Sequence, residues 1–79
     1  MTYMDELIRI IVTPFVDHPE DIQVIKEQSG ERTIYILSVN KEDMGKVIGK
    51  RGRTAQAIRH IIHAAGLAHH EQASLTIRD

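Results

Sequence analysis

The stretch from Val47 to Thr54 constrains this chain more than any other part of its sequence. It consists of Val-Ile-Gly-Lys-Arg-Gly-Arg-Thr, so that two glycines enclose two cations. Glycine adopts positive φ easily and lets a backbone come close to a ligand, and the unpaired N–H groups at the start of a helix favour anions. We therefore predict that Gly49–Gly52 is a tight loop before a helix, and that Lys50 and Arg51 meet phosphate groups.

The charges of the chain are distributed unevenly. Lys and Arg number 10 against 11 Asp and Glu, which gives a net charge of −1 over 79 residues. Every acidic residue nevertheless lies outside residues 44–70, a window whose cations are Lys46, Lys50, Arg51, Arg53 and Arg59. A patch of one sign on an otherwise acidic protein is typical of an anion-binding surface. The alternative is a solvated basic helix face, which would leave the two glycines unexplained.

Hydrophobic periodicity predicts three helices and three strands within one small domain. In chain order these are a helix over 3–12 that Pro14 ends, strands over 22–27 and 33–39 around a turn at 29–31, a short helix capped by Asn40, a helix over 54–65, and a strand over 73–77. A hairpin followed by a two-helix crossover gives a three-stranded mixed sheet with the helices on one face. The predicted class is therefore a two-layer α+β fold.

Several individual positions carry sharper expectations. In the last helix the apolar stripe should be buried, and it comprises Ala55, Ile58, Ile61, Ile62 and Ala65. Gly66 is expected to end that helix, and Gly45 to mark a close contact between helices. The negative charges of Glu42 and Asp43, in the first turn of the short helix, are expected to interact favourably with its dipole. Ile34 and Ile36 should face away from the helices if Tyr35 faces them.

The core from Thr33 to Ile77, in this order of elements, resembles a K-homology (KH) domain, with Gly49-Lys50-Arg51-Gly52 as its GXXG loop. The extra helix and strand before the core resemble the type II arrangement, with the order α-β-β-α-α-β. The string from Asp43 to Thr54 is similar to that of the small single-domain bacterial proteins of the KhpA type. The resemblance covers the whole of residues 1–79, with an N-terminal helix and strand in 1–29 and the KH core in 32–79.

The resemblance implies binding of about four nucleotides of single-stranded RNA beside the loop. Gly49 and Gly52 would let the backbone approach the sugar-phosphate chain, and Lys50 and Arg51 would contact phosphates. Val47 and Ile48 would help to form an apolar floor, although burial in the core is the simpler explanation for both, and one of them can do both. The full set of expected RNA-binding residues is Gly49, Lys50, Arg51, Gly52, Lys46, Val47, Ile48, Arg53, Thr54 and Arg59.

The same resemblance implies the protein's partners and setting. It implies a homodimer, a heteromer with a KhpB-type protein (also called Jag or EloR), or both. It further implies an RNA chaperone or post-transcriptional regulator that acts in cell elongation and division and in peptidoglycan homeostasis. No apolar run is long enough to span a bilayer, so a cytoplasmic protein is expected.

Three other functions compete with RNA binding as interpretations. Catalysis is not expected, because no serine has a nucleophile-elbow context and the loop lacks the Gly-Lys-Ser/Thr ending of a P-loop. A zinc site built on His60, His63, His69 and His70 is the second alternative, but the chain has no cysteine and this segment has no carboxylate, so neither metal nor cofactor is expected. A KH fold used mainly for protein assembly, through Ile34 and Ile36, remains the alternative.

Overall fold

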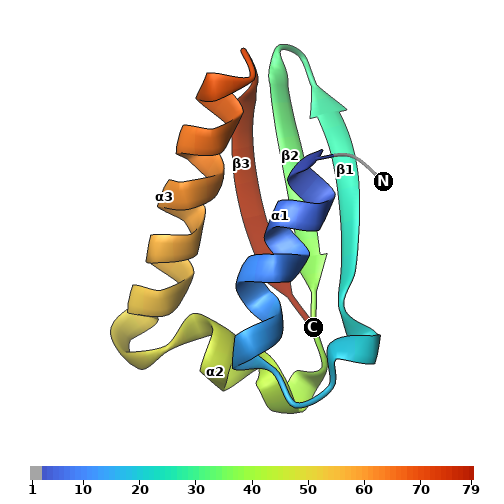
Figure 1. The fold of residues 1–79 in the computed structure, drawn as a ribbon, viewed down its shortest axis with the longest axis vertical. Coiled ribbons are helices and arrows are strands. Elements are labelled where there is room, and N and C mark those ends of the chain that lie inside the picture. Colours follow the sequence, from blue (N-terminus) through green and yellow to red (C-terminus); the bar gives the residue numbers. More distant parts are fainter. Residues whose placement is uncertain (1–2) are drawn as a thin grey trace.

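A computed structural model describes residues 3–79 of the chain as one layer of helices packed on one sheet (Figure 1). The helices are α1 (Tyr3–Val12), α2 (Met44–Ile48) and α3 (Arg53–Ala68), and the strands are β1 (Gln23–Ser29), β2 (Arg32–Ser38) and β3 (Gln72–Arg78). Short 3₁₀ turns cover Thr13–Phe15, Pro19–Asp21, Lys41–Asp43 and Lys50–Gly52. The element order is the predicted one, and the fold is consistent with a type II KH domain.

The sheet has the strand order β1-β2-β3 and is mixed. β1 and β2 form an antiparallel hairpin in which Ile25 pairs with Ile36, whereas β2 and β3 run parallel, with Ile36 opposite Thr76. The parallel pairing needs a crossover between β2 and β3, and that crossover consists of α2, the glycine loop and α3. The topology therefore places the glycine loop in the crossover, at one end of the sheet (Figure 1).

The hydrophobic core lies between the sheet and the two longer helices. Its fully buried members include Ile8 and Val12 of α1, Tyr35 and Leu37 of β2, and Ile62 of α3. The Tyr35 hydroxyl donates a 2.7 Å hydrogen bond to Glu71, and burial and this bond raise the pKa of Tyr35 above its ordinary value. Because Tyr35 points to the helices, Ile34 and Ile36 lie on the opposite face of the sheet, as predicted, where they are half-buried.

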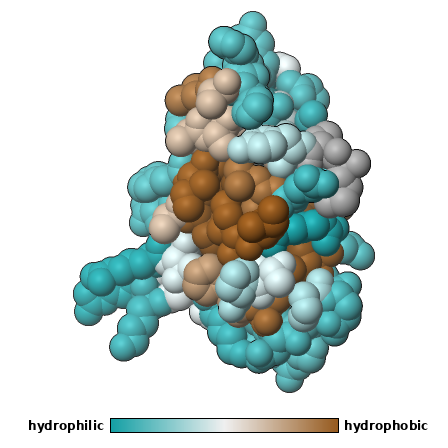
Figure 2. All heavy atoms as spheres, in the orientation of Figure 1, coloured by the Kyte–Doolittle hydropathy of each residue, from teal (hydrophilic) through white to brown (hydrophobic). Residues whose placement is uncertain are grey.

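Apolar side chains also reach the outer surface of the helical layer. Figure 2 shows a hydrophobic area in the middle of this face, in the region of α1 and α3. The exposed large apolar residues of these two helices are Tyr3, Ile10, Ile61 and Leu67. Within residues 3–79, no helix combines the length and the apolar character that crossing a bilayer requires.

The structure corrects three details. Ile61 is 46% exposed and not part of the buried stripe. Gly66 does not end α3, because the helix continues to Ala68 and the left-handed residue after it is His70, with φ 57°. Gly66 is instead a buried point of close approach to β3, whereas Gly45, expected in such a role, is exposed and would have nothing within 4 Å of an added Cβ.

Candidate nucleic-acid interface

The loop between α2 and α3 has a backbone that few residue types tolerate. Gly49 has φ 77° and ψ 174°, a region that is essentially restricted to glycine. Gly52 has φ 72° and is left-handed, and its N–H donates to the Gly49 carbonyl at 3.1 Å, which closes the turn. Arg51 between them is also left-handed, with φ 57° and ψ 25°. Such a conformation is uncommon for a bulky residue, and strained residues of this kind cluster at functional sites.

Thr54 explains why position 49 must lack a side chain. A Cβ on Gly49 would come within 2.7 Å of the Thr54 Cβ and 3.0 Å of the Thr54 backbone nitrogen. Thr54 is half-buried in the first turn of α3, so the loop closes directly over the start of that helix. The predicted pairing of glycines with a following helix is therefore confirmed in its backbone geometry.

The cations of the loop extend into solvent. Lys50, Arg51 and Arg53 are exposed and together line an open pocket of about 370 Å³. Figure 2 shows hydrophilic side chains projecting from the molecule at the lower left, where Figure 1 places the connection between α2 and α3. No ion pair joins these three cations to a carboxylate within residues 3–79. The pocket is thus a concentration of uncompensated positive charge.

The remaining predicted site residues lie in different surroundings. Val47 is fully buried in the core, whereas Ile48 beside it is half-buried. Arg59 lies farther along α3, where its Nε donates to the Leu75 carbonyl of β3 at 3.2 Å. Lys46 forms an ion pair with Asp17, and this bond raises the pKa of Lys46 even though partial desolvation opposes it. The structure therefore gathers Lys50, Arg51 and Arg53 around one pocket, which Lys46 and Arg59 do not line.

A buried carboxylate fastens the start of α2 to the segment that follows α1. Asp43 is 0% exposed, and its two oxygens accept the backbone N–H groups of Asp17 and His18, each at 3.0 Å. Burial would raise the pKa of Asp43, but these two hydrogen bonds and the charges of His18 and Lys46 together hold the pKa below its ordinary value. Asp43 lies at the start of α2, as predicted, but its side chain makes no capping bond to that helix and binds the N–H groups of Asp17 and His18 instead. Asn40 caps the 3₁₀ turn Lys41–Asp43 that leads into α2, rather than α2 itself, by accepting from the N–H of Glu42 at 2.8 Å.

His18 adds a second link at the same junction. Its Nε2 lies 3.1 Å from Glu42 Oε1, and its Nδ1 lies 3.5 Å from Glu20 Oε2. Partial burial lowers the pKa of His18, but the carboxylates of Asp43, Glu42 and Glu20 together raise it above its ordinary value. The junction is therefore held more tightly when the imidazole is protonated.

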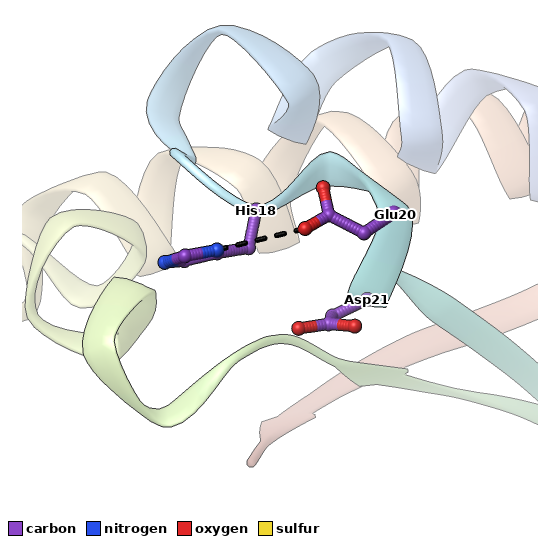
Figure 3. A group of neighbouring side chains, drawn as sticks. All are labelled: His18, Glu20 and Asp21. Carbon is purple, nitrogen blue, oxygen red and sulfur yellow. Dashed lines mark ion pairs between the residues drawn. The ribbon is translucent and has the colours of Figure 1, made fainter.

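Among residues 3–79 the one group with ligand atoms close enough to hold a metal ion is His18, Glu20 and Asp21, within 4.8 Å of one another (Figure 3). All three already have protein partners. Glu20 pairs with His18, and Asp21 accepts from the Asn40 side chain at 2.9 Å. We interpret the group as part of the polar junction. The four histidines considered above as zinc ligands are exposed; these are His60, His63, His69 and His70. His63 lies 3.4 Å from the Ala73 carbonyl.

Sequence reasoning missed the junction made by Asp17, His18 and Asp43. These residues are separated by 25 and 26 positions, and the bonds run from backbone N–H groups to a side chain. No spacing pattern encodes such a contact. The only sequence signal was a carboxylate next to Met44, which also fits the ordinary preference for acids at a helix start.

Comparison with known proteins agrees with this geometry. Residues 5–77 match the family model described as "KhpA/KhpB, KH domain". The chain belongs to the KhpA/KhpB family of KH domains. It is 49% identical over 77 residues to the RNA-binding protein KhpA of Bacillus subtilis strain 168, which covers 98% of this chain and 95% of that protein.

Two further relatives in the family show the same extent of similarity. The RNA-binding protein KhpA of Listeria monocytogenes EGD-e is 50% identical over 74 residues, covering 94% of this chain and 97% of that protein. The protein of the same name from Clostridium perfringens strain 13 is 45% identical over 74 residues, covering 94% and 99%. The similarity therefore extends over almost the whole chain. The KhpA/KhpB family is not enzymatic, in agreement with the prediction from sequence.

Proposed function

We propose that this protein binds single-stranded RNA, and that the loop Gly49–Gly52 holds the sugar-phosphate backbone. The observation that carries the proposal is the pocket lined by Lys50, Arg51 and Arg53, whose charges have no carboxylate partner within residues 3–79. The names of the KhpA relatives support RNA as the ligand. Phosphate contacts give affinity and position, whereas base edges give sequence preference.

The roles of the other residues follow from their surroundings. Gly49 and Gly52 keep the loop backbone close to the phosphates, and Thr54 packs directly against Gly49. Ile48, which is half-buried, offers apolar surface next to the loop, and the buried Val47 supports it from the core. Arg59 extends the positive charge along α3, and Lys46 extends it along α2. A site of about four nucleotides should bind weakly and in a salt-dependent manner.

The experiment is fluorescence anisotropy with a short labelled single-stranded RNA at low and at physiological salt. The wild type is compared with Lys50→Asp/Arg51→Asp, a change that left-handed Arg51 should accept, because aspartate tolerates that conformation. We expect the affinity to fall at least tenfold. We also expect the slope of log affinity against log salt to become shallower by about 0.7 for each phosphate that the variant no longer binds.

The matched control is Lys26→Asp/Lys41→Asp, which reverses two exposed lysines outside the loop and changes the net charge equally. Circular dichroism establishes that both double variants are folded. Equal losses of affinity in the two variants would mean that only net charge matters, and undiminished binding by the loop variant would disprove the proposed site. A single-stranded DNA of the same sequence measures the preference for RNA.

The family suggests a finer role. We propose that the protein acts in the cytoplasm as an RNA chaperone or post-transcriptional regulator, as a homodimer or with a KhpB-type partner, in the control of cell elongation and division. Two sites on one RNA raise the effective concentration of the second contact, which would compensate for the weak binding of a single domain. Sedimentation with and without a purified KhpB-type protein, followed by RNA titration of each species, tests this proposal.

The alternative function is protein assembly with little RNA binding of its own. It is favoured by the open face of the sheet, where Ile25 is 50% exposed beside half-buried Ile34 and Ile36. If assembly dominates, Ile36→Asp abolishes association, while Lys50→Asp/Arg51→Asp changes neither association nor cellular function. The opposite pattern supports RNA binding as the main activity.

A further inference from the structure

Lys46 differs from the other cations of the positive window. Of Lys46, Lys50, Arg51, Arg53 and Arg59, it alone forms an ion pair with a carboxylate within residues 3–79. Its partner is Asp17, 29 residues earlier in the chain, on the connection between α1 and β1. Lys46 lies in α2 about one helical turn before the glycine loop, because it precedes Gly49 by three residues. An acidic side chain from another segment thus reaches the edge of the basic surface.

The position of Asp17 is set independently of the ion pair. Its backbone N–H is bound by the buried Asp43 carboxylate at 3.0 Å, and the next N–H, of His18, is bound by the other oxygen of Asp43. The Asp17 backbone is therefore anchored to the start of α2, and its side chain needs little further ordering to reach Lys46. Forming this ion pair therefore costs less conformational entropy than forming one between two unanchored surface side chains.

The neighbouring carboxylates have other hydrogen-bond and ion-pair partners. Both oxygens of Asp43 accept backbone N–H groups, and Glu42 is paired with His18. They contribute to the negative potential around the Lys46 ammonium, but the direct counter-ion is Asp17. The Asp17 carboxylate therefore neutralises part of the charge with which Lys46 would attract a phosphate.

We propose that Asp17 is a built-in counter-ion of Lys46 that competes with nucleic-acid phosphate, and that it is an affinity-setting residue of the RNA site. The inference rests on the proposed function, because it needs RNA to approach the glycine loop. A phosphate that binds Lys46 must displace Asp17. Both side chains are largely exposed, at 53% and 70%, so the pair is weak enough to be displaced. Exposed pairs of this kind change an equilibrium constant by at most about fivefold.

The test is Asp17→Asn, which keeps the shape of the side chain and the backbone N–H that Asp43 binds. We expect RNA to bind about two- to fivefold more tightly than to the wild type. The slope of log affinity against log salt should steepen by up to about 0.7, because Lys46 becomes available for one additional phosphate. The matched control is Asp21→Asn, which removes the same charge from the same connection but pairs with Asn40 rather than Lys46. It should give less than half of the increase in affinity.

A double-mutant cycle identifies Lys46 as the residue through which Asp17 acts. Lys46→Met removes the ammonium, so Asp17→Asn should give no added affinity in that background beyond the increase seen with Asp21→Asn. Equal increases from Asp17→Asn and Asp21→Asn, or an increase that persists in Lys46→Met, would overturn the inference. The loop variant Lys50→Asp/Arg51→Asp is measured in parallel. If it binds RNA as well as the wild type, the proposed site itself is wrong, and this outcome is distinct from failure of the Asp17 proposal.

Discussion

Gly49 lies so close to Thr54 that a Cβ added to the glycine would be 2.7 Å from the Cβ of the threonine. The clash adds to a backbone conformation, φ 77° and ψ 174°, that side-chain-bearing residues rarely adopt. The steric clash and the backbone conformation have the same cause, because α3 begins directly after the loop. The glycine that ends α2 is therefore also the residue that lets α3 begin where it does.

Gly49→Ala should consequently deform the loop. We expect the free energy of unfolding to fall by about 1–3 kcal/mol, the usual range for one strained residue, and RNA affinity to fall with it. Urea denaturation measures the first quantity and anisotropy the second. An alanine variant with unchanged stability and affinity would show that the loop relaxes freely and that its glycine geometry has no bearing on binding.

Gly45→Ala should have the opposite effect on stability. Gly45 is inside α2, exposed, and without any atom within 4 Å of an added Cβ. Alanine is a better helix former than glycine, so we expect unfolding to require about 0.5–1 kcal/mol more. The same denaturation series provides the measurement, with Gly49→Ala as the internal comparison. A decrease in stability would mean that Gly45 makes a close contact after all.

Gly66→Ala should destabilise the protein through steric overlap with β3 rather than through backbone strain. Its added Cβ would lie 2.7 Å from the Ala73 Cβ and 2.9 Å from the Glu71 carbonyl oxygen. Forcing a methyl group into such a site costs about 1–3 kcal/mol. Thermal unfolding should show a lower Tm, and RNA affinity at a temperature where the variant is folded should be unchanged, because Gly66 lies at the end of α3 remote from the loop.

Asp43→Ala should lower the stability of the protein strongly. The change leaves the backbone N–H groups of Asp17 and His18 without their partner in a part-buried site. Each donor that loses its partner in such a site costs free energy, and together the two should lower the Tm by about 10 °C or more. Asp43→Asn, which keeps one acceptor oxygen, should destabilise the protein less. Equal effects of alanine and asparagine substitutions would show that charge, not hydrogen bonding, holds the junction.

The His18 junction should make stability depend on pH. The pKa of His18 is raised in the folded protein, so its contribution to stability is complete below the unfolded value of about 6.5. The contribution is lost as pH rises through the folded pKa. Denaturation between pH 5.5 and 8.5 should therefore show a component that declines with rising pH in the wild type and is absent from His18→Gln. Identical pH profiles would rule out the pairing with Glu42 and Glu20.

Local sequence was enough to predict the elements of this fold and the loop that defines the candidate site. Helix α1 and the two alternating strands follow from hydrophobic period, and the hairpin follows from Gly30 in its turn. The family resemblance, now supported by a match over residues 5–77, depended on Gly49–Gly52 and on the order of the elements. These features are local because they arise from backbone preferences and from which face of a segment avoids water.

Only the tertiary structure decided which of the predicted residues are free to act. The sequence placed Lys46, Lys50 and Arg51 in one basic window, but folding brings Asp17 against Lys46 and leaves Lys50 and Arg51 without a counter-ion within residues 3–79. It likewise buries Asp43 among backbone donors 25 and 26 residues away and turns Ile61 towards solvent. Such contacts join segments that are distant in the chain, and their energy depends on geometry that no local pattern records.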